Sequence, residues 1–204
     1  VMAKIRLTKN ELKMQRDSLK RFERYLPILQ LKKQQLQVEI GKVDNQIEQL
    51  DSQLENFRQE IDQWVDVFAE TIDLAQLIKV GSINTDTGNI AGIDIPLFVS
   101  LDFKKQDYDY LTTPLWVDQA IEALEQIITQ KAQQLILKKQ KAILQEELRI
   151  TTQRVNLFEN VKIPEARENI RVIQIHLGDL QTAGVVRGKI AKAKIEQRRQ
   201  LVSV

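Results

Sequence analysis

Residues 36–68 read LQVEIGKVDNQIEQLDSQLENFRQEIDQWVDVF. Their apolar side chains recur in alternating steps of four and three residues, at Leu36, Ile40, Val43, Ile47, Leu50, Leu54, Phe57, Ile61, Trp64 and Phe68. This spacing places all of them on one narrow face of an α-helix, a seam typical of a left-handed coiled coil. The same spacing runs back to Leu12, so it predicts a helix from about Thr8 to Ile78. At about 1.5 Å per residue that helix would be roughly 100 Å long.

The helical pattern stops after Gly81, in a segment rich in helix breakers: Gly88, Gly92 and Pro96. We expect a turn at residues 86–89, which read DTGN. After it, residues 93–103 alternate mostly between apolar and polar side chains, the pattern of a half-buried strand. A short partner strand near residues 80–85 would complete a β-hairpin.

A second long helix is expected from Pro114, a residue that often occupies the first turn of a helix. Its seam has polar members at Thr151 and Lys162, and slips near Pro164. Two long helices joined by a compact insert most simply fold back on each other. The sequence thus predicts an all-α antiparallel coiled-coil hairpin with a small β-hairpin insert, one elongated domain. Its parts would be residues 1–79, 80–113 and 114–204.

Basic residues gather at both ends of the chain. Residues 1–38 hold ten Lys or Arg against three acids, whereas residues 39–73 hold ten acids against two bases. If the chain folds back, the two ends meet and form one basic tip. Its members would be Lys4, Arg6, Lys9, Lys13, Arg16, Lys20, Arg21, Arg24, Arg187, Lys189, Lys192 and Lys194.

Two segments resemble motifs of a known family. Residues 89–98, NIAGIDIPLF, are similar to the Asn-Val-Ala-Gly-Val-x-(Ile/Val)-Pro-x-Phe segment of the D subunit of V-type and A-type rotary ATPases. Residues 154–164, RVNLFENVKIP, resemble that family's Arg-(Arg)-Val-Asn-Ala-Leu-Glu-x-x-x-Ile-Pro motif. The matching positions, which we expect to serve interaction or structure, are Asn89, Ala91, Gly92, Ile95, Pro96, Arg154, Val155, Asn156, Glu159, Ile163 and Pro164.

The resemblance implies a central rotor shaft. In this family the paired terminal helices stand inside a hexamer of A and B subunits, and the distal part binds the F subunit and the collar subunit above the membrane ring. The shaft would couple ATP hydrolysis or synthesis in the hexamer to proton or sodium translocation. It would itself be non-catalytic, with the basic tip docking into the hexamer.

Residue chemistry agrees with a non-enzymatic role. The chain has no P-loop, and the Gly-containing run 81–92 lacks the lysine that would hold phosphates. Residues 84–88 lack the full ligand set of a calcium loop, and His176 is the only histidine. We therefore expect no catalytic residue, cofactor or metal. No apolar stretch approaches the roughly 20 residues of a membrane span. The chain is interpreted as cytoplasmic, peripheral to the membrane within a membrane-bound complex.

Other classes of coiled-coil protein remain open. A prefoldin-like chaperone also joins long helices through β-hairpins, although its helices are shorter. A nucleic-acid clamp could bind phosphates with the basic tip, but only Phe22 and Tyr25 there could stack on bases. A membrane-surface scaffold would need one broad basic face rather than opposite charges in different parts of the chain.

Overall fold

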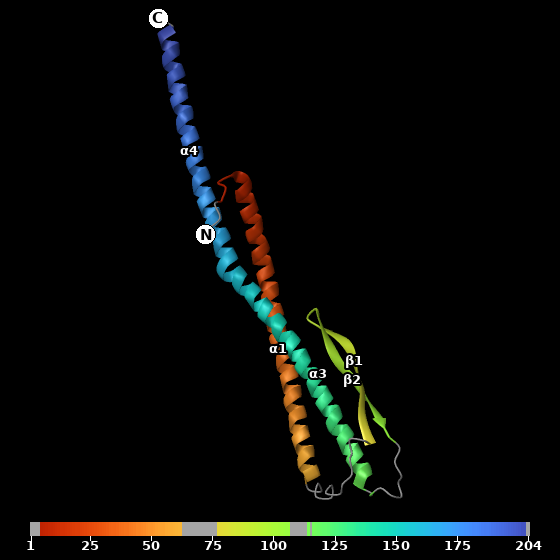
Figure 1. Cartoon of the computed structure of the whole chain (residues 1–204). Helices are drawn as coiled ribbons and strands as arrows, with labels where there is room; N and C mark the ends of the chain where they lie inside the picture. Colours follow the sequence, from red (N-terminus) through yellow and green to blue (C-terminus); the bar gives the residue numbers. More distant parts are fainter. Residues whose placement is uncertain (1–4, 63–76, 107–113, 115, 203–204) are drawn as a thin grey trace. The chain divides into compact units, whose positions relative to one another are not determined.

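A computed structural model describes residues 5–62, 77–106, 114 and 116–202 of the 204-residue chain. The elements in Figure 1 are α1 (Lys9–Asp62), β1 (Ile78–Ile90), β2 (Ile93–Lys105), α3 (Trp116–Leu157), the π-helical turn η2 (Phe158–Lys162) and α4 (Ile163–Val202). The described chain is therefore mostly helical, with a small two-stranded antiparallel sheet. It divides into two compact units, residues 32–151 and residues 1–31 with 152–204.

Helix α1 begins where its capping residue predicts. The Thr8 hydroxyl oxygen accepts the backbone N–H of Glu11 at 3.2 Å, and the Glu11 carboxylate lies in the positive first turn of the helix. The predicted end of this helix at Ile78 is wrong, because Ile78 is the first residue of β1. Residues 63–76, where α1 would have continued, lie outside the described part of the chain.

The predicted seam of α1 is confirmed by burial. Leu36 and Val43 are buried, and the other described seam positions are half-buried. Several positions just outside the seam are largely exposed, such as Leu31 and Val38 at 65% and 59%. The spacing of apolar residues thus identified the covered face of α1. The half-buried members are Leu12, Leu19, Phe22, Leu26, Leu29, Ile40, Ile47, Leu50, Leu54, Phe57 and Ile61.

In the unit formed by residues 32–151, α1 and α3 run antiparallel. Lys32 Nζ lies 2.7 Å from a carboxylate oxygen of Glu147, and Lys141 Nζ lies 2.7 Å from Asp44. Further along α1, Asp51 accepts a hydrogen bond from the side-chain amide of Gln134. Residue numbers rise along α1 as those of its partners on α3 fall, so the two helices have opposite directions. The antiparallel return of the chain within this unit was predicted from the sequence.

The hairpin is longer than predicted and turns later. Strand β1 extends over residues 78–90 and pairs with β2 from Ile78 opposite Lys105 to Ile90 opposite Ile93. The expected turn at residues 86–89 is wrong, since these residues lie within β1. The turn is made by Ala91 and Gly92, whose φ angles are 53° and 79°. Two consecutive positive φ values are typical of the type I′ turn that matches the twist of paired strands.

Two buried clusters attach the hairpin to the helices of the same unit. Near the turn, Ile95 is 2% exposed and belongs to a cluster with Leu36, Val43 and Leu144. At the open end of the hairpin, Ile78 belongs to a cluster with residues of the first turns of α3, namely Val117 and Ile121. Helix α3 begins two residues after Pro114, whose carbonyl accepts the N–H of Val117 at 3.1 Å.

In the unit formed by residues 1–31 and 152–204, the first part of α1 lies beside α4. Arg167 on α4 donates a hydrogen bond to Glu23 on α1 at 2.9 Å. The rings of Phe22 and Phe158 stack with centroids 5.3 Å apart. Pro27 is accommodated inside α1, and the predicted seam slip near Pro164 coincides with η2.

Candidate functional site

Two surfaces of the chain are candidates for function. The first consists of the predicted basic residues near the start of α1 and in the last part of α4, all in the unit of residues 1–31 and 152–204. The second is the motif 89–98 at the turn of the hairpin, in the unit of residues 32–151.

The basic residues of α1 form an exposed surface. Lys20, Arg21 and Arg24 line a shallow hollow together with Met14, Asp17 and Ser18. The other members, Arg6, Lys9, Lys13 and Arg16, are likewise exposed, whereas Lys4 lies outside the described residues. The α1 basic surface is thus defined as Arg6, which precedes the helix, together with the helical residues Lys9, Lys13, Arg16, Lys20, Arg21 and Arg24.

The basic residues of α4 lie on a part of the helix that we call the C-terminal arm, residues 178–202. From residue 178 to residue 198 every side chain is exposed apart from the half-buried Ala183. Exposed apolar residues alternate with the basic ones, for example Val185 at 60% and Ile190 at 52%. The four predicted site residues on the arm are all exposed: Arg187, Lys189, Lys192 and Lys194.

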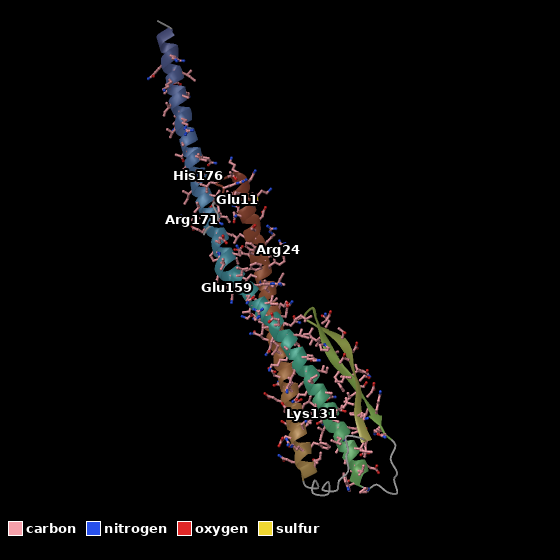
Figure 2. The ribbon with its side chains drawn as sticks, viewed as in Figure 1. Glu11, Arg24, Lys131, Glu159, Arg171 and His176 are labelled. Atoms are coloured by element: carbon pink, nitrogen blue, oxygen red, sulfur yellow. The ribbon has the colours of Figure 1, made fainter. Side chains whose placement is uncertain are left out.

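The arm extends past the beginning of α1. Figure 2 shows His176 near the level of Glu11, with α4 continuing beyond both. Because Arg167 pairs with Glu23 in antiparallel helices, Lys9 falls near the level of residue 181. At about 1.5 Å per residue, residues 187–194 then lie roughly 10–20 Å farther along the axis than Lys9. The structure therefore describes two neighbouring basic surfaces, one on α1 and one on the arm, rather than a single level at which both groups coincide.

An ion pair on the exposed face of α4 illustrates the local electrostatics. Arg171 forms a two-pronged contact with Glu168, with N–O distances of 2.8 and 2.7 Å. This hydrogen bonding, with the positive charge of Arg171, holds the pKa of Glu168 below its ordinary value. Glu146 and Arg149 on α3 show the same arrangement and the same direction of pKa shift. Both acids therefore carry their negative charge at neutral pH.

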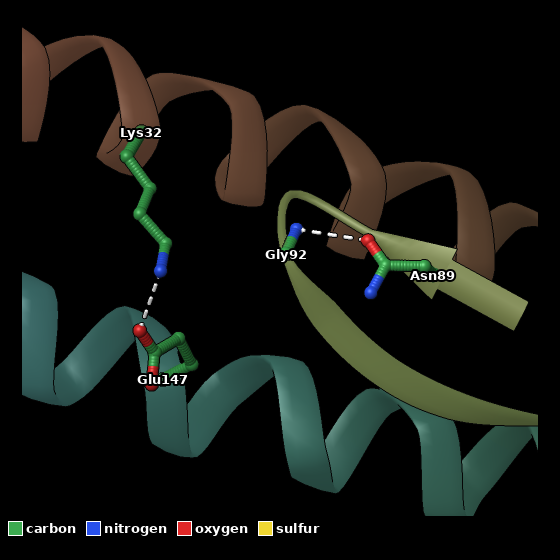
Figure 3. A network of polar contacts seen from close by, with 4 residues as sticks. All are labelled: Lys32, Asn89, Gly92 and Glu147. Atoms are coloured by element: carbon green, nitrogen blue, oxygen red, sulfur yellow. Dashed lines mark hydrogen bonds and ion pairs between the residues drawn. The ribbon is translucent and has the colours of Figure 1, made fainter.

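The motif 89–98 forms the turn and its attachment to the helices. The side chain of Asn89 accepts the backbone N–H of Gly92 and donates to Asp94 at 2.8 Å. Figure 3 shows the first of these contacts, beside the ion pair of Lys32 and Glu147. Within β2, the backbone carbonyl of Pro96 accepts a hydrogen bond of 2.5 Å from Gln140.

Gln140, which holds the hairpin against α3, was not identified from the sequence. Its side chain is 5% exposed, and its amide satisfies a backbone carbonyl of β2. Its position four residues before Leu144, at the seam of α3, was the available signal, because an amide at an apolar position needs a polar partner. The hairpin is therefore attached to α3 by a polar contact as well as by the apolar side chain of Ile95.

The motif 154–164 divides into buried and exposed residues. Val155 and Ile163 are 4% and 8% exposed, so their roles include packing. Three motif residues have largely exposed side chains and are free of the apolar core: Arg154, Asn156 and Glu159. They remain predicted interaction residues.

Nothing in the described residues suggests a metal centre or a bilayer-spanning element. Over this part of the chain no three His, Cys, Asp or Glu side chains lie together as metal ligands would. Among the helices described, none has an apolar stretch long enough to cross a membrane.

Comparison with known proteins gives one consistent family. The family model for the D subunit of ATP synthase matches residues 11–193. A relative from Borreliella burgdorferi, named as the D subunit of a V-type ATP synthase, is 48% identical over 194 residues, which cover 95% of this chain and 96% of the relative. A protein of the same name from Chlamydia caviae is 32% identical over 201 residues, covering 97% of each chain.

Proposed function

This chain belongs to the ATP synthase D-subunit family, and from that membership we propose that it is the non-catalytic central rotor shaft of a V/A-type rotary ATPase. The shaft would couple ATP hydrolysis or synthesis in a hexamer of A and B subunits to proton or sodium translocation. The observation that carries the proposal is 48% identity to the D subunit of a V-type ATP synthase over nearly the full length of both chains.

The antiparallel helices support this role. A shaft that transmits torque needs two helices whose side chains engage over a long distance, because a single helix twists easily. Ion pairs between α1 and α3, at Lys32 with Glu147 and Asp44 with Lys141, cross between the helices at separate levels. We infer that the two helices continue as an antiparallel coiled coil, and that the hairpin stiffens it by packing at both of its ends.

The two basic surfaces would dock into the hexamer. Exposed Lys and Arg side chains attract an acidic cavity over a distance set by screening, about 10 Å at 0.1 M salt. Dispersed charges suit a rotating part, since a tight ion pair at one angle would oppose every step. The exposed apolar residues of the C-terminal arm, such as Val185 and Ile190, would add contact area inside the cavity.

The remaining partners would bind elsewhere on the shaft. For the F subunit and the collar subunit, the exposed Arg154, Asn156 and Glu159 are candidate contacts. The shaft would be a cytoplasmic, peripheral member of the membrane-bound complex, and we expect no nucleic acid among its partners.

Reconstitution tests the proposal. The purified chain alone should hydrolyse no ATP, and adding it with the F subunit to an A/B hexamer should change the turnover and produce rotation of a probe attached to the shaft. ATP hydrolysis by the purified chain would contradict the proposed function. So would a hexamer that does not bind the chain and whose turnover is unchanged when the chain is added.

A matched pair of variants tests the basic surface. Replacing Lys13, Arg16 and Lys20 by Gln removes three positive charges from α1. Replacing Gln46, Gln49 and Gln53 by Glu changes the net charge by the same amount at other exposed positions of the helix. We expect the first variant to bind the hexamer more weakly, most of all at low salt, and the second to bind nearly as the parent does. An equal loss of affinity in both variants would show that binding depends on net charge alone and not on the α1 basic surface.

A further inference from the structure

In the continuous run of α3, η2 and α4, the spacing of the covered residues changes at one point. Along α3 and into the first residue of η2, the covered residues follow in steps of four and three through Leu144, Leu148, Thr151, Val155 and Phe158. Along α4 they follow in steps of three and four through Ile163, Ala166, Ile170, Ile173 and Leu177. Between Phe158 and Ile163 the step is five residues, so the chain carries one residue more than the regular repeat allows. The sequence predicted Lys162 at this seam position, but the structure places Ile163 there, at 8% exposure.

The π turn lies at this extra residue. The backbone N–H of Ile163 donates to the carbonyl of Phe158, five residues back rather than four. A π turn takes up one additional residue while the helix on either side stays α-helical. In an uninterrupted α-helix the extra residue would rotate everything after it by about 100°, the angle of one residue at 3.6 per turn. Lys162 and Glu165 would then replace Ile163 and Ala166 on the covered face.

Pro164 fixes the position of the π turn. Proline has no backbone N–H, and in an α-helix its ring crowds the carbonyl four residues before it, here that of Asn160. A wider turn immediately before the proline relieves this crowding. The stacked ring of Phe158 against Phe22 holds the other end of the turn against α1.

We propose that η2 absorbs the one extra residue, at a position set by Pro164, and thereby keeps α4 and its C-terminal arm in rotational register with α1. We call this role of η2 a phase corrector. The register is held by burial of Ile163, Ala166 and Ile173 after the turn. The direction in which the arm presents its basic residues follows from that register. The importance of that direction for docking rests on the proposed function, whereas the register itself does not.

Deleting Asn160 tests the register directly. The deletion is combined with Pro164→Ala so that the shortened segment can form a regular α-helix, and Pro164→Ala alone is the parent for comparison. If η2 is a phase corrector, the deletion converts it to α-helix and leaves Arg167 facing Glu23. If the π turn instead persists in the deletion variant, each later residue moves into the position of the residue before it. Glu168 would then face Glu23 in place of Arg167.

Cross-linking distinguishes the two results. The chain has no cysteine, so only introduced thiols react with a short bifunctional maleimide. Glu23→Cys is paired with Arg167→Cys or with Glu168→Cys, in both the parent and the deletion variant. We expect the 23–167 pair to give the higher yield in both proteins. A shift of the higher yield to the 23–168 pair in the deletion variant would overturn the proposal.

Thermal unfolding gives a second readout. Deletion of Gln37, an exposed residue of α1 within a regular stretch of the seam, is the control, because no π turn on α1 can absorb the change. The midpoint of the Asn160 deletion variant should stay close to that of Pro164→Ala, whereas the Gln37 deletion should lower the midpoint strongly. A comparable fall in the midpoint of both deletion variants would overturn the proposed role of η2. Failure of every variant and of the unmodified chain to bind the hexamer would count against the proposed function alone, since the cross-linking result stands without it.

Discussion

The side-chain oxygen of Asn89 accepts the backbone N–H of Gly92 at 3.1 Å, across a turn in which Ala91 has a φ angle of 53°. Alanine in this left-handed region costs roughly 1–2 kcal/mol relative to glycine. The hydrogen bond and the packing of Ala91 on the neighbouring buried cluster offset part of that cost. The turn therefore combines a strained residue with a residue that stabilises the strained conformation.

The strain at the turn can be measured with a reciprocal pair of substitutions. Gly92→Ala should destabilise the protein by about 1 kcal/mol, because it places a second Cβ at positive φ (79°) although no atom lies within 4 Å of that Cβ. Ala91→Gly should be neutral or stabilising by less than about 1 kcal/mol, since relief of strain is partly cancelled by the greater freedom of glycine in the unfolded chain. Chemical denaturation of both variants checks this. Destabilisation by Ala91→Gly as large as that by Gly92→Ala would contradict the assigned turn.

The cluster around Ile95 should dominate the stability of its unit. Leu36→Ala, Ile95→Ala and Leu144→Ala each remove a side chain that is 0–2% exposed and should cost about 2–5 kcal/mol. Gln37→Ala, at an exposed neighbouring position, should change the free energy of unfolding by less than about 0.5 kcal/mol. Urea unfolding followed by circular dichroism provides the comparison. If Leu36→Ala and Gln37→Ala shifted the transition equally, the seam of α1 would not pack as described.

The C-terminal arm should contribute to docking without contributing to stability. Truncation after Leu180 removes residues 181–198, which are exposed apart from the half-buried Ala183, together with the last residues of the chain, so the thermal midpoint should stay unchanged within error. Truncation after Ala166 also removes Ile173, which is fully buried, and should lower the midpoint. Under the proposed function both truncated proteins lose affinity for the hexamer. A stable variant truncated after Leu180 that docks as tightly as the full chain would show that the arm is not a docking element.

The two Arg–Glu pairs on exposed helix faces predict a small acid dependence. Arg149 and Arg171 lower the pKa of Glu146 and Glu168 in the folded protein, mainly through hydrogen bonds. A carboxyl group with a lowered folded-state pKa stabilises the protein above its unfolded-state pKa, and this contribution is lost as the pH falls through the folded-state value. Because both pairs are solvent-exposed, the effect on unfolding should be slight. NMR titration of Glu146 should show its pKa rising toward the ordinary value in Arg149→Ala. An unchanged titration curve would mean that the pair does not persist in solution.

The sequence by itself identified the covered face of α1, the second strand of the hairpin and the family. Each depends on information that is local in the chain. Repeated steps of three and four residues place Leu36 and Val43 on one face of any α-helix, and alternation places Ile95 on one face of any strand. The two motifs that indicated the family were equally readable as short segments. The basic residues could be recognised as candidates for the same reason.

Only the tertiary structure decided where the hairpin turns and how the second covered face continues. Asp86 to Asn89 has the composition of a turn, yet pairing of β1 with β2 and burial of Ile95 beside Leu36 and Leu144 move the turn to Ala91 and Gly92. The partner of Gln140 was likewise invisible, because a side-chain amide and a carbonyl 44 residues away meet only after folding. Ile163 rather than Lys162 became buried since the free energy of covering apolar side chains after the π turn outweighs the regularity of one helix. Local spacing fixes which residues can share a face, whereas contacts between distant segments select which of the possible registers is occupied.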